Sequence, residues 1–152
     1  MGAAMRLTLH TDYALRMLIY AATRPDRACT VSDVAEAYGL SRNHLLKVAQ
    51  TLREHDFIET VRGRSGGIRL KREPASIGIG ALVRTIEEDL SLVECMQKRG
   101  GHCVISPCCE LRNMFSEALA AWLAVLDKYT LADIVRNRRQ LGILLGIEGI
   151  AA

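Results

Sequence analysis

Hydrophobic residues in the first third of the chain recur at intervals of three and four, the period of a helix with one buried face. This interval predicts helices over residues 11–22 and 31–38, and a third helix of about 14 residues that follows Ser41. Thr30 and Ser41 are suitable N-cap residues for the second and third helices, and Gly39 is a suitable end for the second. The short gap between these two helices is typical of a helix-turn-helix.

A period of two replaces the helical period in residues 57–61 and 68–71, where apolar and polar side chains alternate. Residues 62–67 between them read RGRSGG, a basic and glycine-rich turn. Alternating segments joined by such a turn predict a β-hairpin. A basic hairpin directly after a helix-turn-helix is the order of elements in a winged helix.

Apolar residues between 109 and 129 step by four and three, the heptad spacing of a helix that packs along another helix. They are Leu111, Phe115, Ala118, Trp122, Val125 and Tyr129. Three heptads favour dimerisation through this helix, and burial against its own domain is the alternative. Shorter helices are expected over residues 79–88 and 130–136, with a loop over residues 89–108.

These elements predict a mainly α-helical fold with a small β-hairpin. Residues 1–78 would form a winged helix-turn-helix region, and residues 79–152 a loop and the long dimerisation helix. No apolar run approaches the roughly 18 residues of a membrane span. The first apolar stretch contains Asp12 and Arg16, unlike a signal peptide, so we expect a cytoplasmic protein with no membrane partner.

Positive charge is concentrated in the first half of the chain, which suits a polyanionic partner. Residues 1–72 hold 12 Lys and Arg against 7 Asp and Glu, whereas residues 73–152 hold 8 against 10. A helix start can reach base edges in the major groove of double-stranded DNA, and a basic hairpin can contact phosphates. The residues expected to contact DNA are Ser41, Arg42, Asn43, His44, Lys47, Arg62, Arg64 and Ser65. Either feature alone could be an ordinary solvent-facing segment.

Four of the five cysteines lie between residues 95 and 109. Cys95, Cys103 and Cys109 have the spacing C-x7-C-x5-C in a segment whose glycines and proline allow it to wrap around a small group. In a reducing cytosol, such a group of thiols favours metal or redox chemistry over disulfides. Thiolates bind iron–sulfur clusters, zinc or Cu(I), and the spacing alone does not choose among them.

Several segments together resemble the IscR/NsrR family of winged-helix regulators. They are MRLTLHTDYALR from Met5, GRSGG from Gly63, the three cysteines, and YTLADI from Tyr129. The resemblance extends from Met5 to about Arg136, and it is greatest to the nitric-oxide-sensing repressors of the family. Residues 1–4 lie outside it.

The resemblance implies a homodimer that binds a pseudo-palindromic operator and releases it when nitric oxide attacks an iron–sulfur cluster. It implies a [4Fe–4S] cluster, or alternatively [2Fe–2S], on Cys95, Cys103 and Cys109, with Asp12 of the partner subunit as the remaining ligand. A carboxylate is a harder and weaker ligand for iron than a thiolate, so this ligand set suits a cluster that opens to nitric oxide.

Some alternatives remain at this point. His10 and His102 are alternative ligands, because other members of the family use histidine. Cys108 departs from the family pattern, and we expect it and the distant Cys29 to hold no cluster. A regulator of iron or cluster supply is the alternative within the family, and a zinc-binding or thiol-redox interaction protein is the alternative outside it. The sequence contains no recognisable catalytic arrangement of residues, so we do not expect an enzyme.

Overall fold

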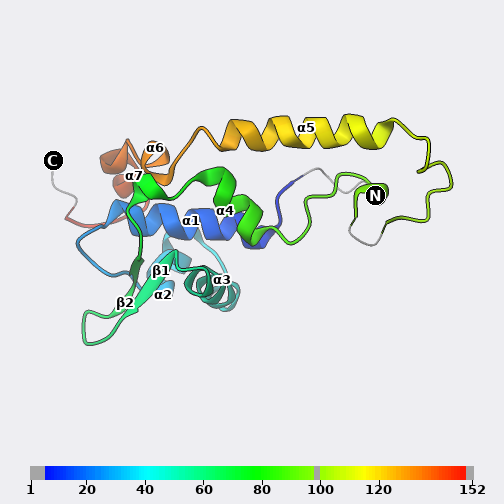
Figure 1. The fold of residues 1–152 in the computed structure, drawn as a ribbon. Helices are drawn as coiled ribbons and strands as arrows, with labels where there is room; N and C mark the ends of the chain where they lie inside the picture. The colour runs from blue at the N-terminus through cyan, green and yellow to red at the C-terminus, as the bar shows by residue number, and fades with distance from the viewer. Residues whose placement is uncertain (1–5, 98–99, 150–152) are drawn as a thin grey trace.

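The computed structural model describes residues 6–97 and 100–149, which are mainly helical with one two-stranded antiparallel sheet (Figure 1). In chain order the elements are α1 (Leu9–Thr23), α2 (Val31–Tyr38), α3 (Arg42–Glu54), β1 (Ile58–Val61), β2 (Gly67–Leu70), the 3-10 helix η1 (Pro74–Ser76), α4 (Ile79–Ile86), the 3-10 helix η2 (Glu94–Met96), α5 (Leu111–Leu126), α6 (Leu131–Ile134) and α7 (Arg138–Leu144). The predicted fold class is confirmed. Within the described ranges, no helix is long and apolar enough to cross a membrane.

Helix α1 lies at the centre of the fold and contacts α3, α4, α6, α7 and β2 (Figure 1). It starts at Leu9, earlier than predicted, because the Thr8 hydroxyl caps it by accepting from the Thr11 N–H. The core residues of α1 include small side chains, which let the surrounding helices approach closely. The fully buried or nearly fully buried apolar residues of α1 are Ala14, Met17, Leu18, Tyr20, Ala21 and Ala22.

The predicted caps position the helix-turn-helix. Thr30 and Asp33 form a capping box at the start of α2, in which the Thr30 hydroxyl accepts from the Asp33 N–H at 3.0 Å. Gly39 ends α2 in the left-handed conformation, with φ of 63°. The Ser41 hydroxyl then accepts from the His44 N–H and starts α3. Helix α3 packs on α1 and α2 through the buried residues Leu45, Val48, Ala49 and Leu52.

The wing is an antiparallel pair in which Ile58 lies opposite Leu70 and Val61 opposite Gly67. Residues before α2 extend this pairing, because Cys29 and Ile68 exchange two backbone hydrogen bonds of 2.9 and 2.7 Å. The wing is therefore held by the α1–α2 connection as well as by its own strands. The sequence pattern did not predict this bridge, since a single paired residue leaves no periodic signal.

The C-terminal end of α5 is fastened to the core. The Arg84 guanidinium of α4 binds the Asp127 carboxylate through two contacts of 2.6 and 2.7 Å. Backbone bonds from the Ile79 N–H to the Tyr129 carbonyl and from the Leu131 N–H to the Ile77 carbonyl complete the attachment. From this anchor, α5 extends beyond the winged helix (Figure 1).

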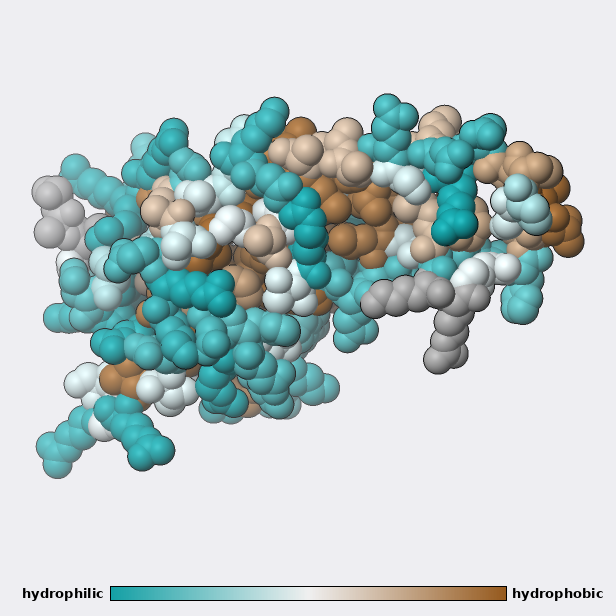
Figure 2. All heavy atoms as spheres, viewed as in Figure 1, coloured by the Kyte–Doolittle hydropathy of each residue, from teal (hydrophilic) through white to brown (hydrophobic). Residues whose placement is uncertain are grey.

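No residue of α5 is buried. The alternative that this helix is buried against its own domain is therefore wrong for the single chain. Figure 2 shows hydrophobic side chains gathered along α5 and beside the loop that precedes it. The sequence also failed to predict α7, which places Gly142 in the core. The proposed boundary after residue 78 stays a prediction.

Gly67 and Gly63 provide a matched pair for testing how the wing is attached. Both have positive φ, 154° and 111°, which disfavours side chains. A Cβ on Gly67 would also lie 2.4 Å from the Cys29 carbonyl oxygen, whereas a Cβ on Gly63 would meet no atom within 4 Å. We expect Gly67→Ala to lower the free energy of unfolding by about 1–3 kcal/mol more than Gly63→Ala in urea denaturation. Equal losses would contradict this attachment.

Candidate nucleic-acid interface and cysteine loop

The outer face of α3 carries polar side chains along its length. Arg42, Asn43 and Lys47, which the sequence predicts to contact DNA, are all exposed on it. The apolar pattern of this helix places Leu46 on its buried side, and this expectation is wrong, because Leu46 is exposed on the outer face. Gln50 is exposed on the same face and was missed, although residues spaced by three and four share one side of a helix.

His44 lies differently from the other predicted α3 residues. Its ring centroid is 4.7 Å from that of Tyr13 and 6.1 Å from that of His10, both on α1. The His44 side chain is therefore half-buried between the two helices. It supports the packing of α3 on α1 and is less accessible than Arg42 or Lys47.

The tip of the wing presents two arginines to solvent. Arg62, Arg64 and Ser65 are exposed between β1 and β2, and neither arginine forms an ion pair within the described part of the chain. In contrast, Arg69 on β2 is paired with Glu59 at 2.6 Å. The tip therefore has cationic side chains that remain available for an anionic partner.

Asp12 lies in the first turn of α1 and binds Arg16 one turn later at 2.8 Å. The Arg16 guanidinium also lies 5.8 Å from the ring centroids of Tyr13 and Tyr38. His10 has its Nε2 atom 3.0 Å from the Thr51 hydroxyl of α3. Within the described residues, no three His, Cys, Asp or Glu side chains gather as a ready-made metal site. A single chain does not bring the predicted ligands together.

The cysteines of the loop are all free thiols. Cys103 and Cys108 are exposed, and Cys95 and Cys109 are half-buried. The Cys108 thiol donates to the Ile105 carbonyl at 3.6 Å, whereas no such bond within the described residues involves the three predicted ligands. Accessible thiols without hydrogen-bond partners are a donor set that fits a thiolate-bound metal centre.

Two acidic residues accept hydrogen bonds at the start of the cysteine loop and just before it. The Glu94 carboxylate accepts from the His102 N–H at 2.9 Å, which links the residues next to Cys95 and Cys103. The buried Glu87 carboxylate accepts from the Thr8 N–H and hydroxyl, with a distance of 3.2 Å to each from one of its oxygens. The start of α1 and the start of the loop are therefore held together.

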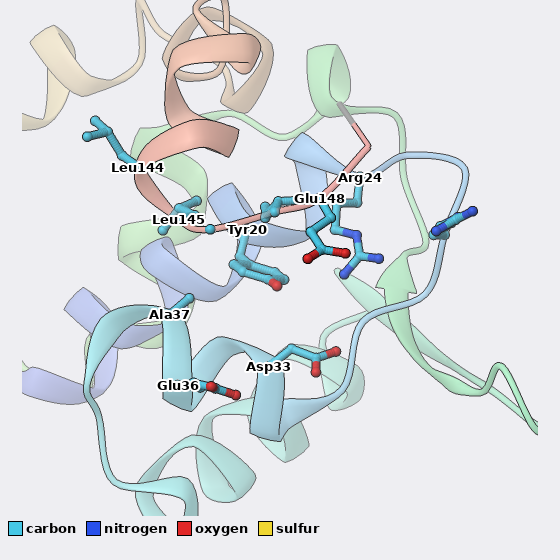
Figure 3. A pocket seen from close by; sticks show the side chains of 11 residues that line it. Tyr20, Arg24, Asp33, Glu36, Ala37, Leu144, Leu145 and Glu148 are labelled. Carbon is cyan, nitrogen blue, oxygen red and sulfur yellow. The ribbon is translucent and has the colours of Figure 1, made fainter. Parts of the chain in front are cut away.

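A groove between α1, α2 and the C-terminal segment carries both signs of charge (Figure 3). Arg24 at the end of α1, Asp33 and Glu36 of α2, and Glu148 line it. The groove lies at the opposite end of α1 from Asp12. It contains none of the residues that the sequence predicted for a functional site.

A helix-turn-helix followed by a basic two-stranded wing defines the winged-helix class. Solved structures share this fold over most of the chain. IscR from T. potens matches with a TM-score of 0.71 at 23% identity over 88% of each chain. CymR, the global cysteine regulator of B. subtilis, matches with a TM-score of 0.70 at 24% identity over 88% of this chain and 98% of that one.

The chain belongs to the Rrf2 family, described as an iron-dependent transcriptional regulator, which it matches over residues 7–137. It is 49% identical over 145 residues to the HTH-type transcriptional regulator NsrR of Bacillus subtilis, covering 95% of this chain and 99% of the relative. It is also 49% identical to the NsrR of Geobacillus kaustophilus, over 93% of this chain and 97% of the relative. These relatives are regulators and not enzymes, as the sequence predicted.

Cys29 should differ from the loop cysteines in reactivity. It is 1% exposed, and burial raises the pKa of its thiol to about 11, with a smaller contribution from nearby Asp33. Because the thiolate is the reactive form, iodoacetamide should modify the four loop thiols of native, reduced, metal-free protein and spare Cys29. Raising the pH from 8 to 9 should leave Cys29 protonated and unmodified. Mass spectrometry measures the adducts, with urea-unfolded protein as the control that accepts five.

A fifth adduct forming in native protein as fast as the other four would contradict the buried position of Cys29.

Proposed function

We propose that this protein is a DNA-binding transcriptional repressor that carries an iron–sulfur cluster and releases its operator in response to nitric oxide. The observation that carries the DNA-binding part is an exposed polar face on α3 together with wing-tip arginines that are exposed and form no ion pair with any described residue. In this fold class, such a helix enters the major groove and flanking cations hold phosphates. The segments that resemble nitric-oxide-sensing repressors support the remainder.

The proposed active form is a homodimer joined along α5. No heptad position of α5 is buried within the described chain, and Trp122, Val125 and Tyr129 are exposed. A second copy of the helix would cover this apolar seam by knobs-into-holes packing. The two α3 helices of a symmetric dimer would then read two related half-sites.

Cys95, Cys103 and Cys109 would hold the cluster, [4Fe–4S] or alternatively [2Fe–2S], with Asp12 of the partner subunit. When bound, the cluster would supply iron to which nitric oxide can bind. The three thiols are soft ligands without competing hydrogen bonds within the described residues, whereas Cys108 is engaged with Ile105. The Asp12 carboxylate would be a harder ligand than the thiolates and therefore the weakest of the set for iron.

The contacts of Asp12 suggest how the signal would reach α3. Asp12 binds Arg16, and Arg16 packs over Tyr13, which contacts His44 of α3. Binding to the partner subunit's cluster would draw Asp12 away from Arg16, and release from the cluster would restore this pairing and alter the packing. Coupling of about 1–3 kcal/mol would change operator affinity by about 5- to 150-fold.

Anaerobic purification followed by titration with nitric oxide tests this proposal. The protein should be brown, contain iron and sulfide, and lose operator binding as its visible absorption is bleached. Cys95→Ser, Cys103→Ser and Cys109→Ser should each abolish the cluster and tight binding to the operator. Cys108→Ser is the matched control and should retain both.

Other outcomes distinguish the rival functions. If the protein keeps its operator in nitric oxide but releases it when iron is removed, it is a regulator of iron or cluster supply. The description of the family as iron-dependent favours this alternative. A colourless protein with zinc or no metal, and without specific DNA binding, would indicate a zinc or thiol-redox protein and would contradict the proposal.

Placing a charge in the α5 seam tests the dimer. Trp122→Glu should shift the protein toward the monomer, because two buried carboxylates would face each other across the seam. Ala121→Glu is the matched control, since Ala121 is an exposed neighbour outside the heptad positions. Sedimentation velocity over a range of concentrations measures the dissociation constant. Equal constants for the two variants would place the dimer interface elsewhere.

A further inference from the structure

The outer face of α3 contains one exposed apolar side chain, that of Leu46. Its exposed fraction is 41%, and no other large hydrophobic side chain between residues 10 and 97 is exposed. The other exposed large hydrophobics of the described chain lie at Leu9, in the cysteine loop, along α5 and toward the C-terminus. Leu46 is therefore isolated from the apolar surfaces that a partner subunit would cover.

The neighbours of Leu46 are polar residues on the outer face of α3. Asn43 lies three residues before it, Lys47 one residue after it and Gln50 four residues after it, and all three are exposed. Residues three and four apart on a helix are surface neighbours, so amide side chains flank Leu46 along the helix axis. Asn and Gln pair with the N6 and N7 atoms of adenine in the major groove.

The same groove presents one apolar group at base edges, the C5-methyl of thymine. We propose that Leu46 is a specificity-determining residue that packs against a thymine methyl in each operator half-site. This inference rests on the proposed DNA-binding function and specifies what the α3 face recognises. A flanking adenine contact from Asn43 would make the recognised segment rich in A·T pairs, whereas the Gln50 amide donates to Glu54 at 2.8 Å.

A protein partner is the alternative occupant of Leu46, but the charge around it favours DNA. Arg42 and Lys47 lie on the same face as Leu46 and have no acidic partner within the described chain. A face with cations beside a single apolar group matches the phosphates and methyl groups of a duplex groove.

The methyl group can be removed from the DNA without changing base pairing. Full-length protein, purified without oxygen, selects its tightest duplex from a random pool, and each thymine of that duplex is replaced in turn by deoxyuridine. We expect one thymine per half-site at which replacement weakens binding by about 4-fold, or about 15-fold when both half-sites are changed, from the loss of one buried methyl each. Fluorescence anisotropy measures the affinities at fixed salt.

Leu46→Ala should bind the thymine duplex as weakly as the wild-type protein binds the deoxyuridine duplex, and should not distinguish the two. The fold should persist, because Leu46 is partly exposed and alanine favours helix; circular dichroism and thermal unfolding check this. Arg64→Ala is the control: it should weaken binding to both duplexes equally and reduce the salt dependence.

The outcomes separate this inference from the function on which it rests. If the protein selects no duplex, the DNA-binding proposal fails. If it selects a duplex but no thymine methyl affects the affinity, or if Leu46→Ala retains the full methyl dependence, the assignment of Leu46 is overturned and DNA binding stands.

Discussion

Helix α1 is buried beneath the elements that pack around it, and its position therefore fixes theirs. Helices α3, α4, α6 and α7 and strand β2 all contact this one helix. Small residues such as Ala14 and Ala21 permit that close approach, and larger ones such as Met17 and Leu18 fill the space between elements. Because so many elements share this surface, a shift of α1 would move the outer face of α3 relative to the rest of the chain.

The first turn of α1 joins the two parts of the proposed function. Thr8 is fixed to the buried Glu87, just before the cysteine loop. Asp12 pairs with Arg16, and Tyr13 contacts His44 on α3. The helix that would present a ligand to the partner subunit therefore also supports the helix that would read DNA. The proposed coupling would need no long relay, because contacts within neighbouring turns of α1 lie between the two proposed sites.

Local signals in the sequence were sufficient to predict most elements. Caps at Thr30 and Ser41, the left-handed Gly39 and the alternating strands depend on neighbouring residues only. The rest depended on contacts between distant segments. The Cys29–Ile68 bridge and the packing of α7 leave no periodic pattern. His44 was predicted to face DNA because it stands at the start of α3, and only the position of Tyr13 on another helix reveals that its ring is half-buried.

The exposed surfaces have two different physical origins. The apolar residues of α5 repeat with a heptad period and lie unburied, which is the pattern of a helix whose core is completed by another helix. Leu46 has no such repeat and stands among polar and cationic residues. The core of a protein interface is stabilised by several adjacent apolar side chains, whereas a DNA groove presents isolated methyl groups between polar base edges. The residues around an exposed leucine therefore indicate the kind of partner it contacts better than its exposed fraction does.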